Sequence, residues 1–135
     1  MENKKILVVD DEPDMRIFVS TVVETLGFEP ITAQNGPEAL EKARSILPAL
    51  VILDVMMPKI EDGIQTYKQF RTDEKLGAIP IIMLSAMAKK TFFHSIWMLN
   101  PERGGRVPEP DAYMEKPPDA NELSRLITGL LPTEE

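Results

Sequence analysis

Apolar residues in this chain fall into short continuous runs, separated by longer stretches in which apolar positions recur every three or four residues. The continuous runs are rich in valine, isoleucine and leucine, as expected of strands covered on both faces. Phe28–Ala33 fits an edge strand best, because Pro30 has no N–H to donate to a ladder. The strands predicted in this way are Lys5–Val9, Phe28–Ala33, Ala49–Val55, Ile79–Ser85 and Asp111–Lys116.

The stretches between these runs have the spacing of amphipathic helices. Pro13 suits the first turn of a helix that stops at Gly27, and Pro37 opens a second helix. An Asp62–Gly63 turn is expected before a short third helix over Ile64–Phe70, and the last helix begins near Asn121. The apolar face of the first helix is predicted to contain Met15, Phe18, Val19, Val22, Val23 and Leu26.

The segment between Ser85 and Lys116 is less regular. An amphipathic pattern is formed by Phe92, Phe93, Ile96, Trp97 and Leu99. Prolines and glycines then prevent regular continuation at Pro101, Gly104, Gly105, Pro108 and Pro110. We therefore expect a short helix followed by an extended loop before the last strand.

Strands that alternate with helices predict a doubly wound α/β fold, with a parallel sheet and helices on both faces. In such a fold, ligands bind at the carboxyl ends of the strands. Polar residues lie at or just past the ends of four predicted strands: Asp10 and Asp11, Asp54, Ser85, and Lys116. The sequence thus predicts that these side chains meet at one rim of the sheet.

Composition narrows the functions that this rim could serve. The 135 residues are expected to form one domain, residues 1–135. With 22 acidic against 15 basic residues and a net charge of −7, direct nucleic-acid binding is disfavoured. Without cysteine and with one histidine, the usual zinc sites cannot be assembled, so any metal site must use oxygen ligands.

The first residues do not have the character of a signal peptide. Their apolar run lasts only from Ile6 to Val9 before two aspartates end it. No apolar stretch is long enough to span a bilayer. A soluble cytoplasmic protein without a membrane partner is the expectation.

Three carboxylates that converge without basic neighbours raise one another's pKa, and such a cluster normally holds a cation. Mg²⁺ is the first choice among oxygen-ligand ions. A carboxylate beside Mg²⁺ can attack a phosphoryl group as a nucleophile. Lys116 would then supply a positive charge to that group, and Ser85 a hydrogen bond. Aspartyl phosphorylation at Asp54 is the chemistry that these residues favour.

Four segments, "ILVVDDEPDMR", "VILDVMMP", "IPIIMLSA" and "AYMEKPPDANEL", together resemble the receiver domain of two-component response regulators, including chemotaxis regulators. The resemblance implies a flavodoxin-like fold with five parallel strands in the order 2-1-3-4-5. It also implies that Mg²⁺ is held by Asp10, Asp11, Asp54 and the Met56 backbone carbonyl. Asp54 would be the phosphoacceptor, Ser85 the switch hydroxyl, Lys116 the phosphate partner and Tyr113 the aromatic switch.

Simpler interpretations exist for several of these residues. The acids at 10–12 could only mark a helix N-terminus, where they interact favourably with the helix dipole. Asp54 could be a turn residue and Lys116 a solvated loop lysine. An aromatic such as Tyr113 is more often simple packing. Their joint placement at one rim favours the functional interpretation over these separate ones.

The chain departs from the family in two places. The "KIEDG" loop carries one extra residue beside Asp54, and the segment from Ser85 to Lys116 is longer than usual. The resemblance places the signalling surface there, on the fourth helix, fifth strand and fifth helix. The aromatic cluster is either buried core or, in the sharper hypothesis, an exposed partner or homodimer interface around Trp97.

Three functions compete. The first is a receiver phosphorylated by a histidine kinase or phosphotransfer protein, which dephosphorylates itself slowly and signals to an unknown output protein without being an enzyme otherwise. Such a receiver could stand alone or belong to a longer protein. The second is a phosphohydrolase with an aspartyl-phosphate intermediate, disfavoured because Met56 stands where those enzymes have an acid/base aspartate. The third is a degenerate receiver that binds partners without being phosphorylated.

Overall fold

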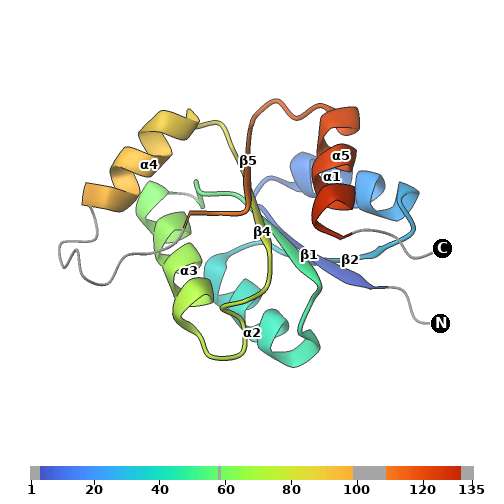
Figure 1. The fold of residues 1–135 in the computed structure, drawn as a ribbon, viewed down its shortest axis with the longest axis horizontal. Helices are drawn as coiled ribbons and strands as arrows, with labels where there is room; N and C mark the ends of the chain where they lie inside the picture. Colours follow the sequence, from blue (N-terminus) through green and yellow to red (C-terminus); the bar gives the residue numbers. More distant parts are fainter. Residues whose placement is uncertain (1–3, 58, 99–108, 132–135) are drawn as a thin grey trace.

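In the computed structural model, which describes residues 4–57, 59–98 and 109–131, five strands alternate with five helices (Figure 1). The strands are β1 (Lys5–Val9), β2 (Glu29–Ala33), β3 (Leu50–Leu53), β4 (Ile81–Ser85) and β5 (Ala112–Glu115). The helices are α1 (Pro13–Thr25), α2 (Gly36–Ile46), α3 (Ile60–Thr72), α4 (Lys89–Met98) and α5 (Ala120–Leu130). All paired strands are parallel, in the order β2-β1-β3-β4-β5, which confirms the predicted doubly wound, flavodoxin-like fold.

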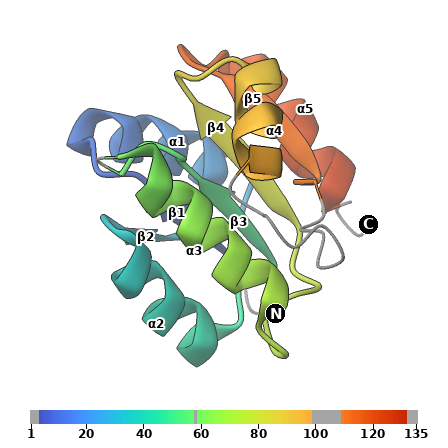
Figure 2. The ribbon, with the colours of Figure 1, turned by 90° about the vertical axis from the view of Figure 1, so that its left-hand side faces the viewer.

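Both faces of the sheet are buried, as the continuous apolar strands require. Successive strand residues point to opposite faces, so Leu7 and Val9 join one core while Ile6 and Val8 join the other. Figures 1 and 2 show α1 and α5 on one face of the sheet and α2 and α3 on the other. Phe92 of α4 is buried in the same core as α2 and α3.

The buried face of α1 and the position of β2 in the sheet agree with the sequence. Val19, Val22 and Val23 of α1 are buried, as its predicted apolar face requires. β2 lies at the edge of the sheet, where Pro30 is opposite Ile6 and needs no further ladder partner. The prediction of an edge strand at this position is therefore confirmed.

The start of α3 differs from the prediction. An Asp62–Gly63 turn before a short helix over Ile64–Phe70 is wrong, because α3 already begins at Ile60. The Asp62 carboxylate accepts a hydrogen bond from the Lys59 N–H at 3.2 Å, which satisfies a free donor at the helix start. A Cβ at Gly63 would collide with the backbone carbonyl of Val55. This glycine permits close helix packing against the residue that follows Asp54, and it does not form a turn.

The predicted short fourth helix is present as α4. Phe92 is fully buried and Phe93 packs beside it against the same core. This part of the aromatic cluster is therefore core. The described part of the structure does not include the side chains of Ile96 and Trp97. It also does not include residues 99–108, where Leu99 and the expected loop fall. The hypothesis of an interface around Trp97 therefore stays a prediction.

None of the helices within the described ranges combines the length and the apolar character that crossing a membrane requires.

Candidate functional site

Parallel ladders place three of the predicted site residues side by side at the carboxyl ends of the strands. The Asp10 N–H donates to the Ala33 carbonyl at 3.1 Å, and the Asp54 N–H donates to the Val9 carbonyl at 3.0 Å. The Lys116 N–H donates to the Ser85 carbonyl at 2.8 Å. Each residue therefore starts a loop from a fixed backbone position. The predicted convergence of Asp10, Asp54 and Lys116 at one rim is what the fold produces.

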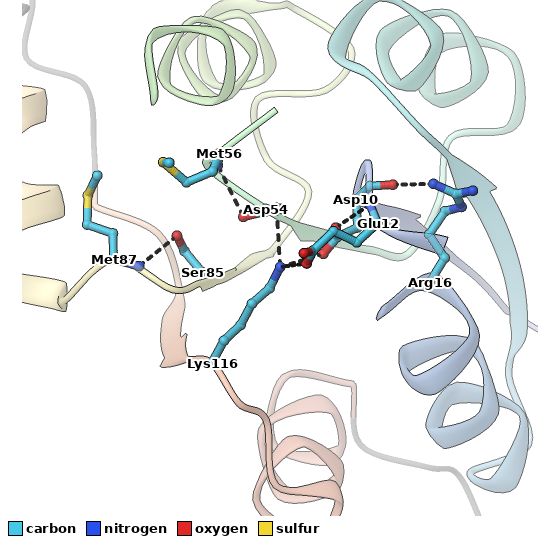
Figure 3. A network of polar contacts seen from close by, with 8 residues as sticks. All are labelled: Asp10, Glu12, Arg16, Asp54, Met56, Ser85, Met87 and Lys116. Carbon is cyan, nitrogen blue, oxygen red and sulfur yellow. Dashed lines mark hydrogen bonds and ion pairs between the residues drawn. The ribbon is translucent and has the colours of Figure 1, made fainter. Parts of the chain in front are cut away.

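The ammonium group of Lys116 is the centre of this site (Figure 3). Its Nζ donates to one oxygen of each of three carboxylates, at 3.0 Å to Asp10, 3.0 Å to Glu12 and 3.3 Å to Asp54. A lysine ammonium has three N–H donors, so these contacts use all of them. Lys116 is thus held in place entirely by negative charge.

The second oxygens of the two buried aspartates are held by the backbone. Asp10 Oδ1 accepts from the Glu12 N–H at 2.9 Å, and Asp54 Oδ1 accepts from the Met56 N–H at 3.1 Å. The Arg16 guanidinium donates to the Asp10 carbonyl at 2.7 Å. Both aspartates are only 3% exposed. Their carboxylates therefore have fixed orientations before any ligand arrives.

Burial and mutual repulsion perturb the charges of this cluster. Burial, together with the neighbouring Asp10 charge, raises the pKa of Asp54 from its ordinary value of 3.8 to about 6, although Lys116 and the Met56 N–H act to lower it. Burial also raises the pKa of Asp10, although the Glu12 N–H and Lys116 act against it. For Lys116, burial acts to lower the pKa, but Asp54, Asp10 and Glu12 outweigh it and raise the pKa. Negative charge is therefore in excess at this rim.

A divalent cation fits this excess. Asp10, Asp11 and Asp54 each offer a carboxylate oxygen, and these oxygens lie within 4.8 Å of one another. Asp11 is exposed, so the group opens toward solvent on one side. Carboxylate oxygens are the ligands that Mg²⁺ and Ca²⁺ prefer. The three residues predicted to bind metal are thus brought together, whereas the role of the Met56 carbonyl stays a prediction.

Ser85 and Tyr113 are joined through one residue of the β4–α4 connection. The Ser85 hydroxyl, which is fully buried, accepts from the Met87 N–H at 3.1 Å. The Tyr113 hydroxyl donates to the Met87 carbonyl at 2.6 Å, and its ring packs 5.1 Å from Phe92 between centroids. Burial raises the pKa of Tyr113 to about 12, so its hydroxyl keeps its proton at neutral pH. The two predicted switch residues therefore share the Met87 peptide groups.

Two polar residues at this site were not predicted. Glu12 was interpreted only as an acid at a helix N-terminus, yet it contacts Lys116, and Arg16 contacts the Asp10 carbonyl. Glu12 directly follows the Asp10–Asp11 pair in the sequence, which is the one signal that could have suggested it. The long-range contact itself depends on where β5 lies, which local pattern does not specify.

Comparison with known proteins identifies relatives of this chain. The family model described as "Response regulator receiver domain" matches residues 6–100. The alkaline phosphatase synthesis transcriptional regulatory protein PhoP of Bacillus subtilis is 40% identical over 129 residues, 96% of this chain and 49% of PhoP. Response regulator Rre1 of Synechocystis is 35% identical over 127 residues, 93% of this chain and 51% of Rre1. This chain thus spans about half the length of these curated relatives.

The same likeness holds in three dimensions. The structure of the chemotaxis response regulator CheY4 of Vibrio cholerae superimposes with a TM-score of 0.78 at 26% identity. The match covers 96% of this chain and 100% of that one. The sequence and the fold therefore point to the same family of proteins.

Proposed function

Because this chain belongs to the response regulator receiver domain family, we propose that it accepts a phosphoryl group on Asp54. The observation that carries the proposal is the position of the Asp54 carboxylate. It is buried at the end of β3, with one oxygen 3.3 Å from Lys116 Nζ and the other held by the Met56 N–H. A carboxylate fixed in this way, beside a cation and two further acids, is suited to nucleophilic attack on phosphorus.

The donor would be a phosphohistidine on a histidine kinase or phosphotransfer protein. An Asp54 oxygen attacks phosphorus, the P–N bond breaks, and its electron pair stays on the imidazole, leaving an acyl phosphate on Asp54. Lys116 holds a phosphoryl oxygen, and the Ser85 hydroxyl donates to another. Asp10, Asp11 and Asp54, with the Met56 carbonyl, would hold Mg²⁺, which supplies positive charge that offsets the phosphoryl oxygens when bound.

The consequence of phosphorylation would be a change in protein contacts and not turnover of an external substrate. Drawing Ser85 toward the phosphoryl group would disturb its bond to the Met87 N–H, and Met87 also accepts from Tyr113. This couples the acceptor to the face formed by α4, β5 and α5. An output protein or a second copy of the chain would bind that face. Release of phosphate would be slow, because Met56 cannot act as an acid or base.

Intact mass after incubation with acetyl phosphate and Mg²⁺ tests this function. The expected result is a gain of one phosphoryl group that is absent from Asp54→Ala and absent when a chelator is added. Asp14→Ala, which removes an exposed carboxylate of α1 outside the cluster, is the matched control and should still gain the group. No gain in folded wild-type protein would instead favour a receiver that binds partners without phosphorylation.

A further inference from the structure

Glu12 occupies the N-cap of α1 but does not cap it. Its backbone is extended, with φ −94° and ψ 117°, and its side chain makes no cap hydrogen bond. At the N-caps of α2 and α5, by contrast, Asn35 and Asp119 accept from the N–H three residues on. Short polar side chains are preferred at this position because they reach those donors. The Glu12 carboxylate is instead directed to Lys116, 3.0 Å away.

Glu12 differs from the other two partners of Lys116 in what happens to it during the proposed reaction. Asp54 becomes an acyl phosphate, and Asp10 is a predicted metal ligand. Glu12 has neither role, and its side chain is 62% exposed at the solvent side of Lys116. Since all three donors of Lys116 are in use, a phosphoryl oxygen can bind the ammonium only if a carboxylate gives way.

We propose that Glu12 is a positioning residue that restrains phosphorylation, because it competes with the incoming phosphoryl group for Lys116. The inference rests on the proposed function of Asp54 and adds a regulator of the same site. Two effects act in the same direction. The Glu12 carboxylate occupies a donor that the phosphoryl oxygen needs, and its negative charge repels an anionic phosphoryl donor at the mouth of the site.

The expected size of the effect follows from the exposure of the pair. Ion pairs with one well-exposed partner contribute little free energy, so removing the competitor should change rates by about twofold to fivefold. Glu12 also adds to the negative charge that attracts a cation. Its removal is therefore best studied with Mg²⁺ at saturation, where a modest loss of metal affinity no longer affects the rate.

The test compares Glu12→Gln with wild type in two measurements at saturating Mg²⁺. The first is the rate of phosphorylation by acetyl phosphate, in which the Asp54 oxygen attacks phosphorus and acetate leaves with the electron pair of the broken P–O bond. The second is the affinity for beryllium fluoride, which mimics an aspartyl phosphate without turnover and is followed by fluorine NMR. Glu24→Gln removes the same charge from the exposed far end of α1 and is the matched control.

The expected result is faster phosphorylation and tighter beryllium fluoride binding by about twofold to fivefold in Glu12→Gln, with Glu24→Gln unchanged. Raising the salt concentration should shrink the difference in phosphorylation rate, because charges at this exposed position are screened. An unchanged or slower rate in Glu12→Gln, beside a wild type that is phosphorylated, would overturn the role of Glu12 alone. A wild type that is never phosphorylated would overturn the proposed function and this inference together.

Discussion

Two clusters, each built around one cation, lie at opposite ends of the strands and differ in their charge balance. At the carboxyl ends, Lys116 contacts three carboxylates. Ahead of the amino ends of β4 and β5, Arg71 of α3 contacts one carboxylate, Asp111, at 3.1 Å. Its other hydrogen-bond partners are uncharged. They are the carbonyls of Gly77, Ile79 and Glu109, at 3.5, 3.2 and 3.3 Å, and the Tyr67 hydroxyl at 3.2 Å.

The difference distinguishes a cluster that holds the fold together from the cluster for which we propose a function. Asp111 also accepts from the Ile81 N–H at 2.7 Å, so the Arg71 cluster ties α3, β4 and β5 together with balanced charge. The planar guanidinium suits such a multiple, fixed contact. At the other end, the Lys116 ammonium contacts the carboxylates of Asp10, Glu12 and Asp54, and the Asp11 carboxylate lies near those of Asp10 and Asp54. This excess of negative charge is the observation that supports the proposed cation site.

Breaking the balanced cluster should give the largest loss of stability. Arg71→Leu removes a guanidinium whose side chain is only 7% exposed, and it leaves the Asp111 carboxylate and three backbone carbonyls without this donor. We expect the free energy of unfolding to fall by about 2–4 kcal/mol, measured by urea denaturation.

Arg44→Leu is the matched control, because Arg44 forms an ion pair with Asp73 and its side chain is 52% exposed. Its loss should cost less than about 1 kcal/mol. Equal costs for the two variants would show that the Arg71 cluster is no more structural than an exposed ion pair.

Breaking the Lys116 cluster should lower stability by a smaller amount, and metal binding should reverse this loss. Lys116→Met leaves Asp10 and Asp54 buried without their cation, which should cost about 1–3 kcal/mol when no divalent metal is present. Saturating Mg²⁺ should shrink this difference, because the ion replaces the missing positive charge. Saturating Mg²⁺ should not restore the stability that Arg71→Leu loses. Unfolding curves with and without Mg²⁺ compare the two variants. If Mg²⁺ did not reduce the loss of stability in Lys116→Met, the distinction between the Arg71 and Lys116 clusters would be contradicted.

The raised pKa of Asp54 predicts that this residue makes the stability of the protein depend on pH. The folded protein keeps the Asp54 proton up to about pH 6, whereas an unfolded chain releases it near 3.8. The folded state therefore binds more protons in this window, and without metal this residue should make stability fall as pH rises from about 4 to 6. The difference in unfolding free energy between wild type and Asp54→Asn measures this contribution. A difference that stays constant across the window would rule it out.

The smallest expected effects concern the lifetime of the phosphoryl group. Met56, 38% exposed, and Met87 stand two residues after Asp54 and Ser85, and neither side chain can activate water. We expect Met56→Asn and Met87→Glu to change the decay rate about threefold, or about 0.7 kcal/mol in the barrier. Decay of phosphorylated protein, followed by intact mass after removal of the donor, gives the rates. Decay at the wild-type rate in both variants would show that these two positions do not influence the lifetime of the phosphoryl group.

Sequence predicted this fold well where one strong pattern controlled each element. Continuous apolar runs identified the strands, and the parallel ladder then carried Asp10, Asp54 and Lys116 to one rim. The prediction failed at Gly63, because close packing against Val55 and a turn use glycine equally well. Contacts such as Glu12 with Lys116 depend on where distant elements meet, so local periodicity does not reveal them.

The most direct test of the account is the identity of the phosphorylated residue. Borohydride reduces an aspartyl phosphate to homoserine, and peptide mass spectrometry of protein treated with acetyl phosphate and Mg²⁺ locates that residue. We predict homoserine at position 54, with Asp10 and Asp11 unchanged. Homoserine elsewhere in a phosphorylated chain, with Asp54 intact, would contradict the claim that this rim exists to present Asp54.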